Sequence, residues 1–497
     1  MKAPILALAV AAALPAAAHA ETAITVYSSA APGTLDARTF ASGGEGAVVP
    51  GYSLVREDRP FTLKAGRNVL RIDDVPAFID PTTVSFASLT DPAHTRVVEQ
   101  SFEFDLTSTA KLLSRYLGRD ITVEQARGQS VEMVSGTLVG TQGALILKQP
   151  DGSVRMVPNN AGVRLPGLPG GLISKPTLVW DVEAANAGTQ KARFTYQTGG
   201  MTWWTDYNVI VSTPRGGGCR ADVGAWVTLV NQSGASFDDA KLKLVAGDVQ
   251  RVQRAAYAED KIYPQALAAA PAKARGFEEK SFFEYHMYTL GRPASLAQNS
   301  TKQIELFPAA SHVGCEKALV YYGQGSRPGY GGLVTERDPG MQANRKVDVY
   351  LRLKNSKENH LGIPLPAGRI RVAQLDPADK SLEFVGEDAI GHTAREETVQ
   401  VKLGSAFDVV GERRQVDFHL DTTGKWMEEE FEVKVRNRKV DQAVSVDVRE
   451  SLYRWSNWTL TRKSQDYVKE DARTVRFPVR IAPNGEAVVR YTVRYTW

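Results

Sequence analysis

Hydrophobic and polar residues alternate with a period of two along most of the chain after residue 21. The segments 101–106, 346–353, 431–436 and 444–449 each carry an apolar residue at every second position. The last segment is the most regular and places these residues on one side: Val489, Tyr491, Val493, Tyr495 and Trp497. A period of two puts apolar side chains on one face of a β-strand and polar side chains on the other. The pattern therefore predicts antiparallel sheets that have one face in water.

Turn sequences and a shortage of helical patterns support the same fold class. Pro150-Asp151-Gly152 and Pro483-Asn484-Gly485 each lie between two apolar segments, and their Asp-Gly and Asn-Gly pairs tolerate the positive φ of tight hairpins. Only Ser108–Leu117 has apolar residues at helical spacing, and Gly118 is expected to end that helix. We therefore predict an all-β protein built from several antiparallel β domains with one short helix.

The same patterns divide the chain into five segments. The predicted segments are a signal peptide (1–20), an N-terminal β domain ending in the helix (21–118), a small barrel-like β domain (119–170), a β domain with a mobile loop at 251–280 (171–340), and an immunoglobulin-like or fibronectin-like β-sandwich (341–497). The barrel is expected because short strands joined by tight turns lose their exposed edges when the sheet closes. Pro- and Gly-rich stretches at 166–171 and 323–340 mark two boundaries.

The first twenty residues have the pattern of a secretory signal peptide. Lys2 is followed by the apolar run 5–17, and Ala18-His19-Ala20 is a small-x-small cleavage site. No later segment has 18 consecutive apolar residues, so we expect no membrane span after cleavage. The sequence therefore predicts a periplasmic protein.

Composition excludes several classes of protein and suggests one covalent link. The 60 Lys+Arg and 56 Asp+Glu residues are spread thinly, which argues against a nucleic-acid partner. The chain has 2 cysteines, too few for a zinc-ribbon array or an iron–sulfur protein. Cys219 and Cys315 lie near the starts of predicted strands of one domain. In an oxidising compartment we expect them to form a disulfide.

The usual catalytic templates find no complete match. Ser108-x-x-Lys111 resembles the nucleophile motif of penicillin-binding enzymes, but its partner motifs are missing, so Ser108 or Thr107 is expected to cap the helix. The histidines are scattered, without His-x-x-x-His spacing for zinc. Neighbouring carboxylates, as in Glu428-Glu429-Glu430, point to opposite faces of a strand. We therefore assign no catalytic residue, metal or cofactor.

Four tryptophans are the candidate ligand-binding residues. Trp203 and Trp204 are adjacent, so one must point inward and the other outward, and Trp455 and Trp458 flank a Ser-Asn pair. An exposed indole suits a sugar ring, because it buries a large area with little loss of rotamer freedom. The alternative is that these rings pack at sheet corners or between domains.

From about Leu178 onward, several motifs occur in a recognisable order. These motifs are Tyr196–Tyr207, Asn231–Gly234 followed by Leu242–Leu244, Ile363–Ile370 and Phe384–Asp388. In this order they resemble a bacterial domain-of-unknown-function family shared with the mucoidy-inhibitor proteins. The resemblance implies an exported all-β protein with a role in the cell envelope, and it supplies no catalytic residues. Mucoidy-inhibitor relatives have a coiled coil where this chain has the barrel-like segment 119–170, so any function of the coiled coil is not transferred.

Two functions therefore remain open at the level of sequence. The first is an exported, noncatalytic envelope protein that binds a periplasmic partner or a surface polysaccharide. The second is a periplasmic hydrolase of glycan or peptide whose carboxylates come from separate strands. A convergent pair of carboxylates in a cleft would favour the hydrolase, and a flat surface would favour the binding protein.

Overall fold

The structure is a computed structural model in which almost every element is a strand. It describes residues 21–27, 49–104, 108–128, 130–167, 175–214, 218–247, 249, 277–323, 332–337, 344–376 and 378–497. The predicted signal peptide and most of the predicted loop 251–280 lie outside the described residues, as do parts of both Pro- and Gly-rich stretches. In the described ranges, no helix is long and apolar enough to cross a membrane. The predicted all-β fold class is confirmed.

The described strands form four sheets, of which three lie in the first part of the chain. The eight-stranded sheet has the order β16-β17-β15-β1-β2-β12-β4, with β18 paired to β15: β1 (Glu21–Tyr27), β2 (Tyr52–Leu63), β4 (Ile79–Ser88), β12 (Gly188–Gly199), β15 (Phe237–Ala246), β16 (Phe277–Phe282), β17 (Tyr285–Leu290) and β18 (Ala294–Leu296). A three-stranded sheet contains β3 (Gly66–Ile72), β11 (Thr177–Ala184) and β5 (Thr95–Glu103). A five-stranded sheet contains β10 (Asn160–Arg164), β6 (Asp120–Arg127), β7 (Ser130–Gly140), β8 (Leu145–Lys148) and β9 (Val154–Val157).

The fourth sheet has thirteen strands and reaches the end of the chain. Its order is β22-β21-β13-β14-β19-β20-β23-β24-β29-β26, and β25, β28 and β27 branch from β19. The bounds are β13 (Met201–Ser212), β14 (Cys219–Asn231), β19 (Ser300–Tyr322), β20 (Lys346–Lys354), β21 (Gly368–Leu375), β22 (Leu382–Ile390), β23 (Thr398–Asp421), β24 (Trp426–Asn437), β25 (Val444–Ser451), β26 (Trp458–Lys463), β27 (Val468–Lys469), β28 (Thr474–Ile481) and β29 (Glu486–Thr496).

The eight-stranded sheet joins two segments that the sequence places in separate domains. β1, β2 and β4 come from residues 21–118, whereas β12, β15 and β17 come from residues 171–340. β1 pairs with β2 on one side and, in parallel, with β15 on the other. The observed pairing therefore differs from the predicted division at residue 171. Turn and linker signals are local, and they carry no information about pairing between strands so distant in sequence.

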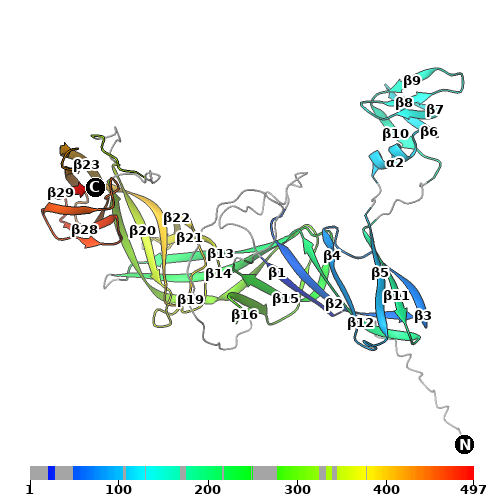
Figure 1. Ribbon diagram of the computed structural model, residues 1–497, viewed down its shortest axis with the longest axis horizontal. Helices are drawn as coiled ribbons and strands as arrows, with labels where there is room; N and C mark the ends of the chain where they lie inside the picture. The colour runs from blue at the N-terminus through cyan, green and yellow to red at the C-terminus, as the bar shows by residue number, and fades with distance from the viewer. Residues whose placement is uncertain are drawn as a thin grey trace, which may run out of the picture.

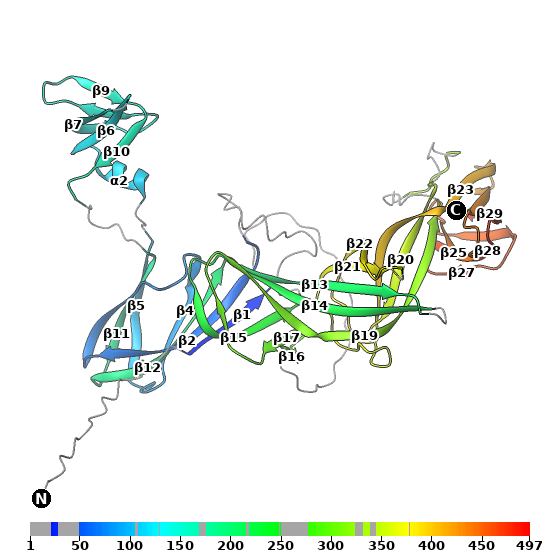
Figure 2. The ribbon, with the colours of Figure 1, turned by 180° about the vertical axis from the view of Figure 1, so that it is seen from behind.

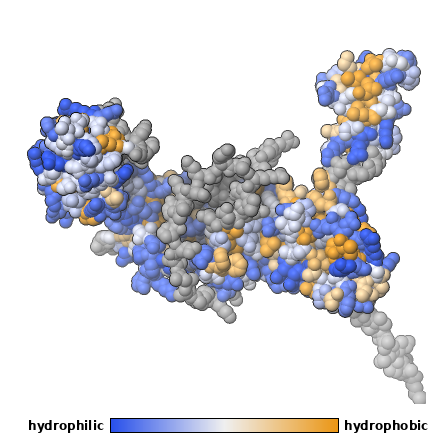
Figure 3. Space-filling view, viewed as in Figure 1, coloured by the Kyte–Doolittle hydropathy of each residue, from blue (hydrophilic) through white to orange (hydrophobic). Residues whose placement is uncertain are grey.

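The five-stranded sheet, preceded by the helix α2 (Thr109–Arg115), has its own small core. Ser108 caps α2 by accepting a hydrogen bond from the Lys111 backbone N–H at 3.3 Å, which confirms the capping role. Among the described residues, no ladder joins the edge strands β9 and β10, so the predicted barrel stays open along one seam. Met156 is 67% exposed on this unit, and Figure 3 shows apolar side chains gathered on one side of it.

Three strands pass from a large central core into the C-terminal core. In β19, Ile304 to Val313 lie in the central core, and Leu319 and Tyr321 lie in the C-terminal core. In β20, Leu351 and Leu353 lie in the central core, and Val347 lies in the C-terminal core. In β23, Val399 and Val401 lie in the central core, and Val409 lies in the C-terminal core. β19 has 23 residues and β23 has 24, so each spans roughly 75–80 Å at ~3.3 Å per residue. Figures 1 and 2 show both strands continuing from the middle of the molecule into its C-terminal end.

This continuity changes the predicted boundary at residue 341. The C-terminal residues do form a sandwich-like core, but residues 351–401 pack mainly in the central core. The division between cores runs through strands and not through the Gly-rich stretch. An alternating strand looks the same in sequence before and after it changes partner, so its pattern cannot reveal the change.

The two predicted hairpin turns have different outcomes. Gly152 has φ +87° and joins the paired strands β8 and β9, as predicted. Asn484 has φ +52°, but the strands on either side of it, β28 and β29, pair with other strands. The Asn437 side chain donates to the Ala482 carbonyl at 3.0 Å and helps to hold this second turn. The turn therefore crosses between layers of the C-terminal core instead of closing a hairpin.

Cys219 and Cys315 form a disulfide, as predicted, with a Cα–Cα distance of 4.9 Å. Cys219 is the first residue of β14, and it lies directly opposite Cys315 on β19. From Leu319 onward, β25 replaces β14 as the neighbour of β19 on that side. The disulfide therefore lies at the point where β19 changes partner.

The double variant Cys219→Ser/Cys315→Ser is expected to be markedly less stable than the oxidised wild type. The disulfide spans 96 positions, and a loop near that length is worth about 4–5 kcal/mol in the chain-entropy model. Urea unfolding measures the difference. Wild type kept reduced is the control and should unfold at the midpoint of the double variant. Equal midpoints for the oxidised wild type and the double variant would contradict the prediction.

A buried ion pair anchors a connecting segment to the C-terminal core. Arg454 Nε lies 2.8 Å from Glu429 Oε2, and both side chains are 1% exposed. Arg454 also donates to the backbone carbonyls of Val334 and Glu336, at 3.1 and 2.6 Å, while Gln415 donates to Glu429 Oε1 at 2.7 Å. These bonds offset the cost of removing both charges from water. The pair thereby fixes the described segment 332–337 against the sandwich.

Arg454→Met is expected to destabilise the protein by about 3–5 kcal/mol, because it leaves the buried Glu429 carboxylate without a countercharge. Arg96→Met is the matched control, since Arg96 pairs with Glu183 at the surface, where the two side chains are 74% and 53% exposed. That exposed pair should be worth less than about 1 kcal/mol. Denaturant unfolding of both variants tests the difference, and equal effects would show that the buried pair has no special weight.

Candidate binding surface

The adjacent tryptophans of β13 are both buried, as in the packing alternative that the sequence left open. They point to opposite faces, as alternation requires. Trp203 is 1% exposed and lies in the central core, whereas Trp204 is 7% exposed and packs with Val49 and Val230. Neither ring offers an exposed face, so direct ligand binding by Trp203 and Trp204 gains no support from the structure. The segment before β2 supplies Val49 as a cover, which the alternation within β13 cannot reveal.

Trp455 and Trp458 are half-buried and pack against the C-terminal core. The Trp458 indole N–H donates to the Ala472 carbonyl at 2.8 Å, and Lys469 Nζ lies 4.8 Å from the centre of a Trp458 ring. The indole is therefore engaged at its edge and approached by a cation. A ligand-binding role for these two residues stays a prediction.

Trp226 has the exposure that a binding role requires. It is 40% exposed on β14, where it is paired with Asp206 on β13 and with Glu305 on β19. Its neighbours Ala225 and Val227 are buried in the central core, so the alternation of the strand directs the indole outward. We call the outer side of β19, β14, β13, β21 and β22 around this residue the Trp226 face.

Asp206 organises the polar part of the Trp226 face. This buried carboxylate accepts hydrogen bonds at Oδ2 from the Trp204 indole N–H (2.9 Å) and the Thr228 hydroxyl (2.7 Å). Its Oδ1 accepts a hydrogen bond from Arg369 at 3.1 Å and lies 3.5 Å from an Arg371 nitrogen. Asp206 therefore fixes two guanidinium groups beside Trp226. Trp204 contributes by orienting Asp206 and not by touching a ligand.

A second exposed aromatic ring lies on the same face. Phe384 is 66% exposed on β22 and is paired with Ala373 on β21, on the same outer side as Arg371. Three strand spacings of ~4.8 Å and four residues of ~3.4 Å separate it from Trp226 along the sheet, which is roughly 20 Å. The face therefore has an aromatic ring toward each end and hydrogen-bonding groups between them.

The sequence contained a signal for Trp226 but none for Phe384. Alternate positions of this strand are apolar: Val223, Ala225, Val227 and Leu229. Trp226 lies between them, at a position that the alternation assigns to the polar face. A large aromatic residue at such a position is a candidate for exposure. The orientation of Phe384 depends on a bulge between Val372 and Ala373, which shifts the register and has no clear mark in the sequence.

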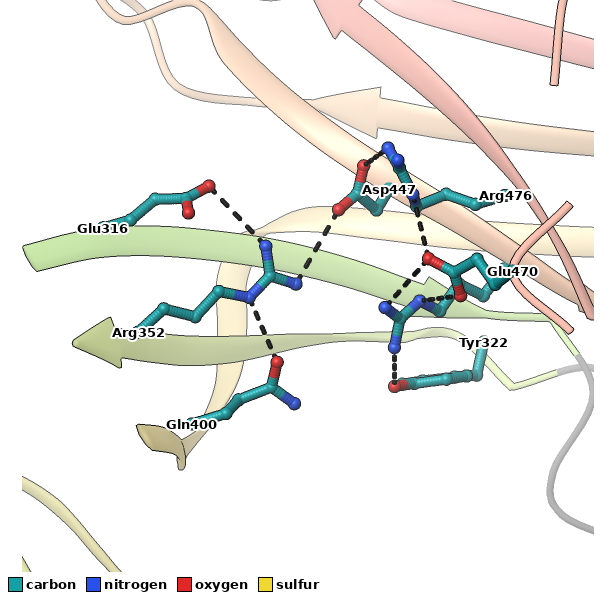
Figure 4. A network of polar contacts seen from close by, with 8 residues as sticks. Glu316, Tyr322, Arg352, Gln400, Asp447, Glu470 and Arg476 are labelled. Carbon is teal, nitrogen blue, oxygen red and sulfur yellow. Dashed lines mark hydrogen bonds and ion pairs between the residues drawn. The ribbon is translucent and has the colours of Figure 1, made fainter. Parts of the chain in front are cut away.

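A separate polar cluster lies where β19 changes partner (Figure 4). Arg352 on β20 lies 3.6 Å from Glu316 and 3.9 Å from Asp447. Arg476 on β28 bridges Asp447 and Glu470, at 3.0 and 2.9 Å. These contacts connect β25 and β28 to β19 and β20. Each of these charges faces an opposite charge, so the cluster acts as a structural link.

A third charged cluster surrounds Glu432 on β24. Glu432 is 1% exposed and accepts hydrogen bonds from Arg490 Nε at 2.7 Å and from Arg414 Nε at 2.9 Å. Lys434 Nζ lies 3.6 Å away. The hydrogen bond from Arg490, together with the other cations, lowers the pKa of Glu432 to about 2 from its usual 4.5, against the opposing effect of burial.

A metal site would draw its ligands from acidic, histidine and cysteine side chains. Within the described ranges, no three His, Cys, Asp or Glu side chains gather closely enough to hold a metal ion. Glu428 pairs with Arg494 and Glu429 with Arg454, so these neighbouring carboxylates point to different partners, as predicted.

Comparison of the sequence with protein-family models and with curated proteins found no match. The evidence for the candidate surface is therefore the geometry of the Trp226 face.

Glu432→Gln is expected to remove a pH-dependent part of the stability. Because the folded-state pKa of about 2 lies below the ordinary 4.5, the ionised group stabilises the fold above pH 4.5, and this contribution is lost as the pH falls toward 2. The advantage of wild type over Glu432→Gln should therefore be constant above pH 4.5 and shrink below it. Unfolding free energies across this range measure it. An advantage that stays constant down to pH 2 would contradict the assigned role.

Proposed function

We propose that this chain is an exported, noncatalytic protein of the cell envelope that binds a surface polysaccharide or a periplasmic partner through the Trp226 face. The observation that carries the proposal is the exposed Trp226 beside two arginines that the buried Asp206 holds in place. An exposed indole supplies a large contact area at small entropic cost. Polar groups that are already ordered reduce the entropy lost on binding.

Export and an envelope location are supported by other observations. Residues 1–20 have the pattern of a signal peptide, and a disulfide such as Cys219–Cys315 persists in oxidising compartments. The resemblance of the region after Leu178 to the mucoidy-inhibitor family points in the same direction. None of these observations identifies the ligand.

The hydrolase alternative gains no support from the buried carboxylate of this surface. A general acid or nucleophile needs a carboxyl group that is able to reach a substrate. Asp206 is the buried carboxylate of the Trp226 face, and both of its oxygens already accept hydrogen bonds from protein groups. Its geometry fits a positioning role.

Trp226→Ala is expected to weaken binding to envelope material at least tenfold, which corresponds to about 1.4 kcal/mol. The probes are immobilised polysaccharide and a periplasmic protein extract from the producing cells, and bound protein is measured by sedimentation and pull-down. Trp226→Tyr should retain most of the binding, because it keeps an exposed aromatic ring.

Trp426→Ala is the matched control. Trp426 lies on the outer face of β24, where His419 stacks against it at 5.3 Å and the Arg494 guanidinium lies 4.6 Å from its ring. Because its ring is already covered, its removal should leave binding unchanged. Unaltered binding of Trp226→Ala to both probes, with an unchanged unfolding midpoint, would overturn the proposed function.

A further inference from the structure

We infer that the ligand of the Trp226 face is an uncharged oligosaccharide that lies across the strands from Trp226 to Phe384. This inference rests on the proposed function and narrows it to one class of ligand. Three features of the face carry it: the balance of its charges, the shape of the surface beside Trp226, and the positions of the two exposed aromatic rings.

The charges of the face are compensated internally. Asp206 faces Arg369 and Arg371, and Arg371 also lies 3.3 Å from Glu387. Two cations are therefore matched by two carboxylates. Glu305 is exposed beside Trp226 and adds a negative charge. A polyanion would gain no net attraction here and would be repelled at one end, whereas an uncharged chain loses nothing.

The surface next to Trp226 is open because the adjacent outward position of β14 is Gly224. A Cβ atom built at Gly224 would meet only the Asn208 carbonyl, at 4.0 Å, so neither packing nor backbone strain requires glycine at this position. Glycine within a strand often marks a place where a ligand approaches closely. Its lack of a side chain leaves the edge of the indole clear for a ring to lie flat on the sheet.

The groups across the face match the two kinds of surface on a sugar. The C–H face of a pyranose ring is apolar and packs against an aromatic ring, and Trp226 and Phe384 provide two such rings roughly 20 Å apart along the sheet. Between them, Asn208 is exposed and Arg371 is 37% exposed, so Asn208 can donate to and accept from hydroxyl groups and Arg371 can donate to them. A single small molecule would reach one ring, whereas an oligosaccharide can reach both.

The test is calorimetric titration of the mature protein with soluble glycans of both kinds. The uncharged probes are dextran, maltodextrin, laminarin, galactomannan and cello-oligosaccharides, and the acidic probe is polygalacturonate. We expect at least one uncharged glycan to bind, with a Kd that changes less than twofold between about 50 and about 500 mM NaCl, since screening acts only on charges. Polygalacturonate should not bind.

Two variants locate that binding on the face. Gly224→Leu places a side chain on the open surface without a steric clash at Cβ, and Phe384→Ala removes an exposed ring, so both should keep the wild-type unfolding midpoint. Each is expected to weaken binding of the uncharged glycan at least tenfold. Unchanged binding in both variants would overturn the inference.

The outcomes also separate this inference from the proposed function. Binding of polygalacturonate that weakens more than tenfold over the salt range would overturn the uncharged class, and so would the failure of every uncharged glycan. If Trp226→Ala still loses binding to envelope polysaccharide or to a periplasmic protein in those cases, the proposed function stands while the inference fails. If Trp226→Ala loses no binding at all, both fail.

Discussion

The sharing of β19, β20 and β23 between two cores is the constraint on which the rest of the structure depends. Each strand buries one set of residues in the central core and another in the C-terminal core. A rotation of one core against the other would break backbone ladders along all three strands. The weak point is the edge of β19 where its pairing with β14 stops and its pairing with β25 starts. The disulfide and the ion pairs of Figure 4 lie on either side of this point. Covalent and ionic links thus reinforce the place where the ladder is interrupted.

The same arrangement determines where a binding surface can form. The Trp226 face is the outer side of the central core, and its strands are held on their inner side by that core. Its last strand, β22, is also fixed at its far side, because Asp388 accepts a hydrogen bond from the Lys402 backbone N–H of β23 at 2.8 Å. The positions of Trp226 and Phe384 are therefore set by paired strands and not by loops. A rigid surface of this kind favours a ligand of fixed spacing.

How much of this could be predicted depends on the range of the interaction that determines each feature. The period of two is local, and it correctly indicated the all-β class. The helical spacing of Ser108–Leu117 is equally local, and it indicated the helix that Ser108 caps. The disulfide followed from thiol chemistry and from the predicted oxidising compartment. Pairing partners depend on distant segments, so the shared sheet of the first half and the split strands were not visible. The cover of Trp204 by Val49 is of the same kind, since it comes from a separate part of the chain.

The Trp226 face also shows why the alternation of apolar and polar positions along a strand did not by itself locate a site. Arginines held by a buried carboxylate recur among the described residues, around Glu57, Asp58, Asp206, Glu429, Glu432 and Glu450. At Glu429 the cation is buried with its partner. On the face that carries Glu432, Trp426 is covered by His419 and Arg494.

Only beside Asp206, among the described residues, does the ordered charge pair adjoin an exposed indole and a strand glycine on one surface. The buried carboxylate supplies order in all of these clusters, so order by itself does not distinguish a binding surface from a structural link. What distinguishes the Trp226 face from the other clusters is that an exposed indole adjoins the ordered groups. A ligand that covers this indole removes its apolar area from water, which is worth about 25 cal/mol for each Å².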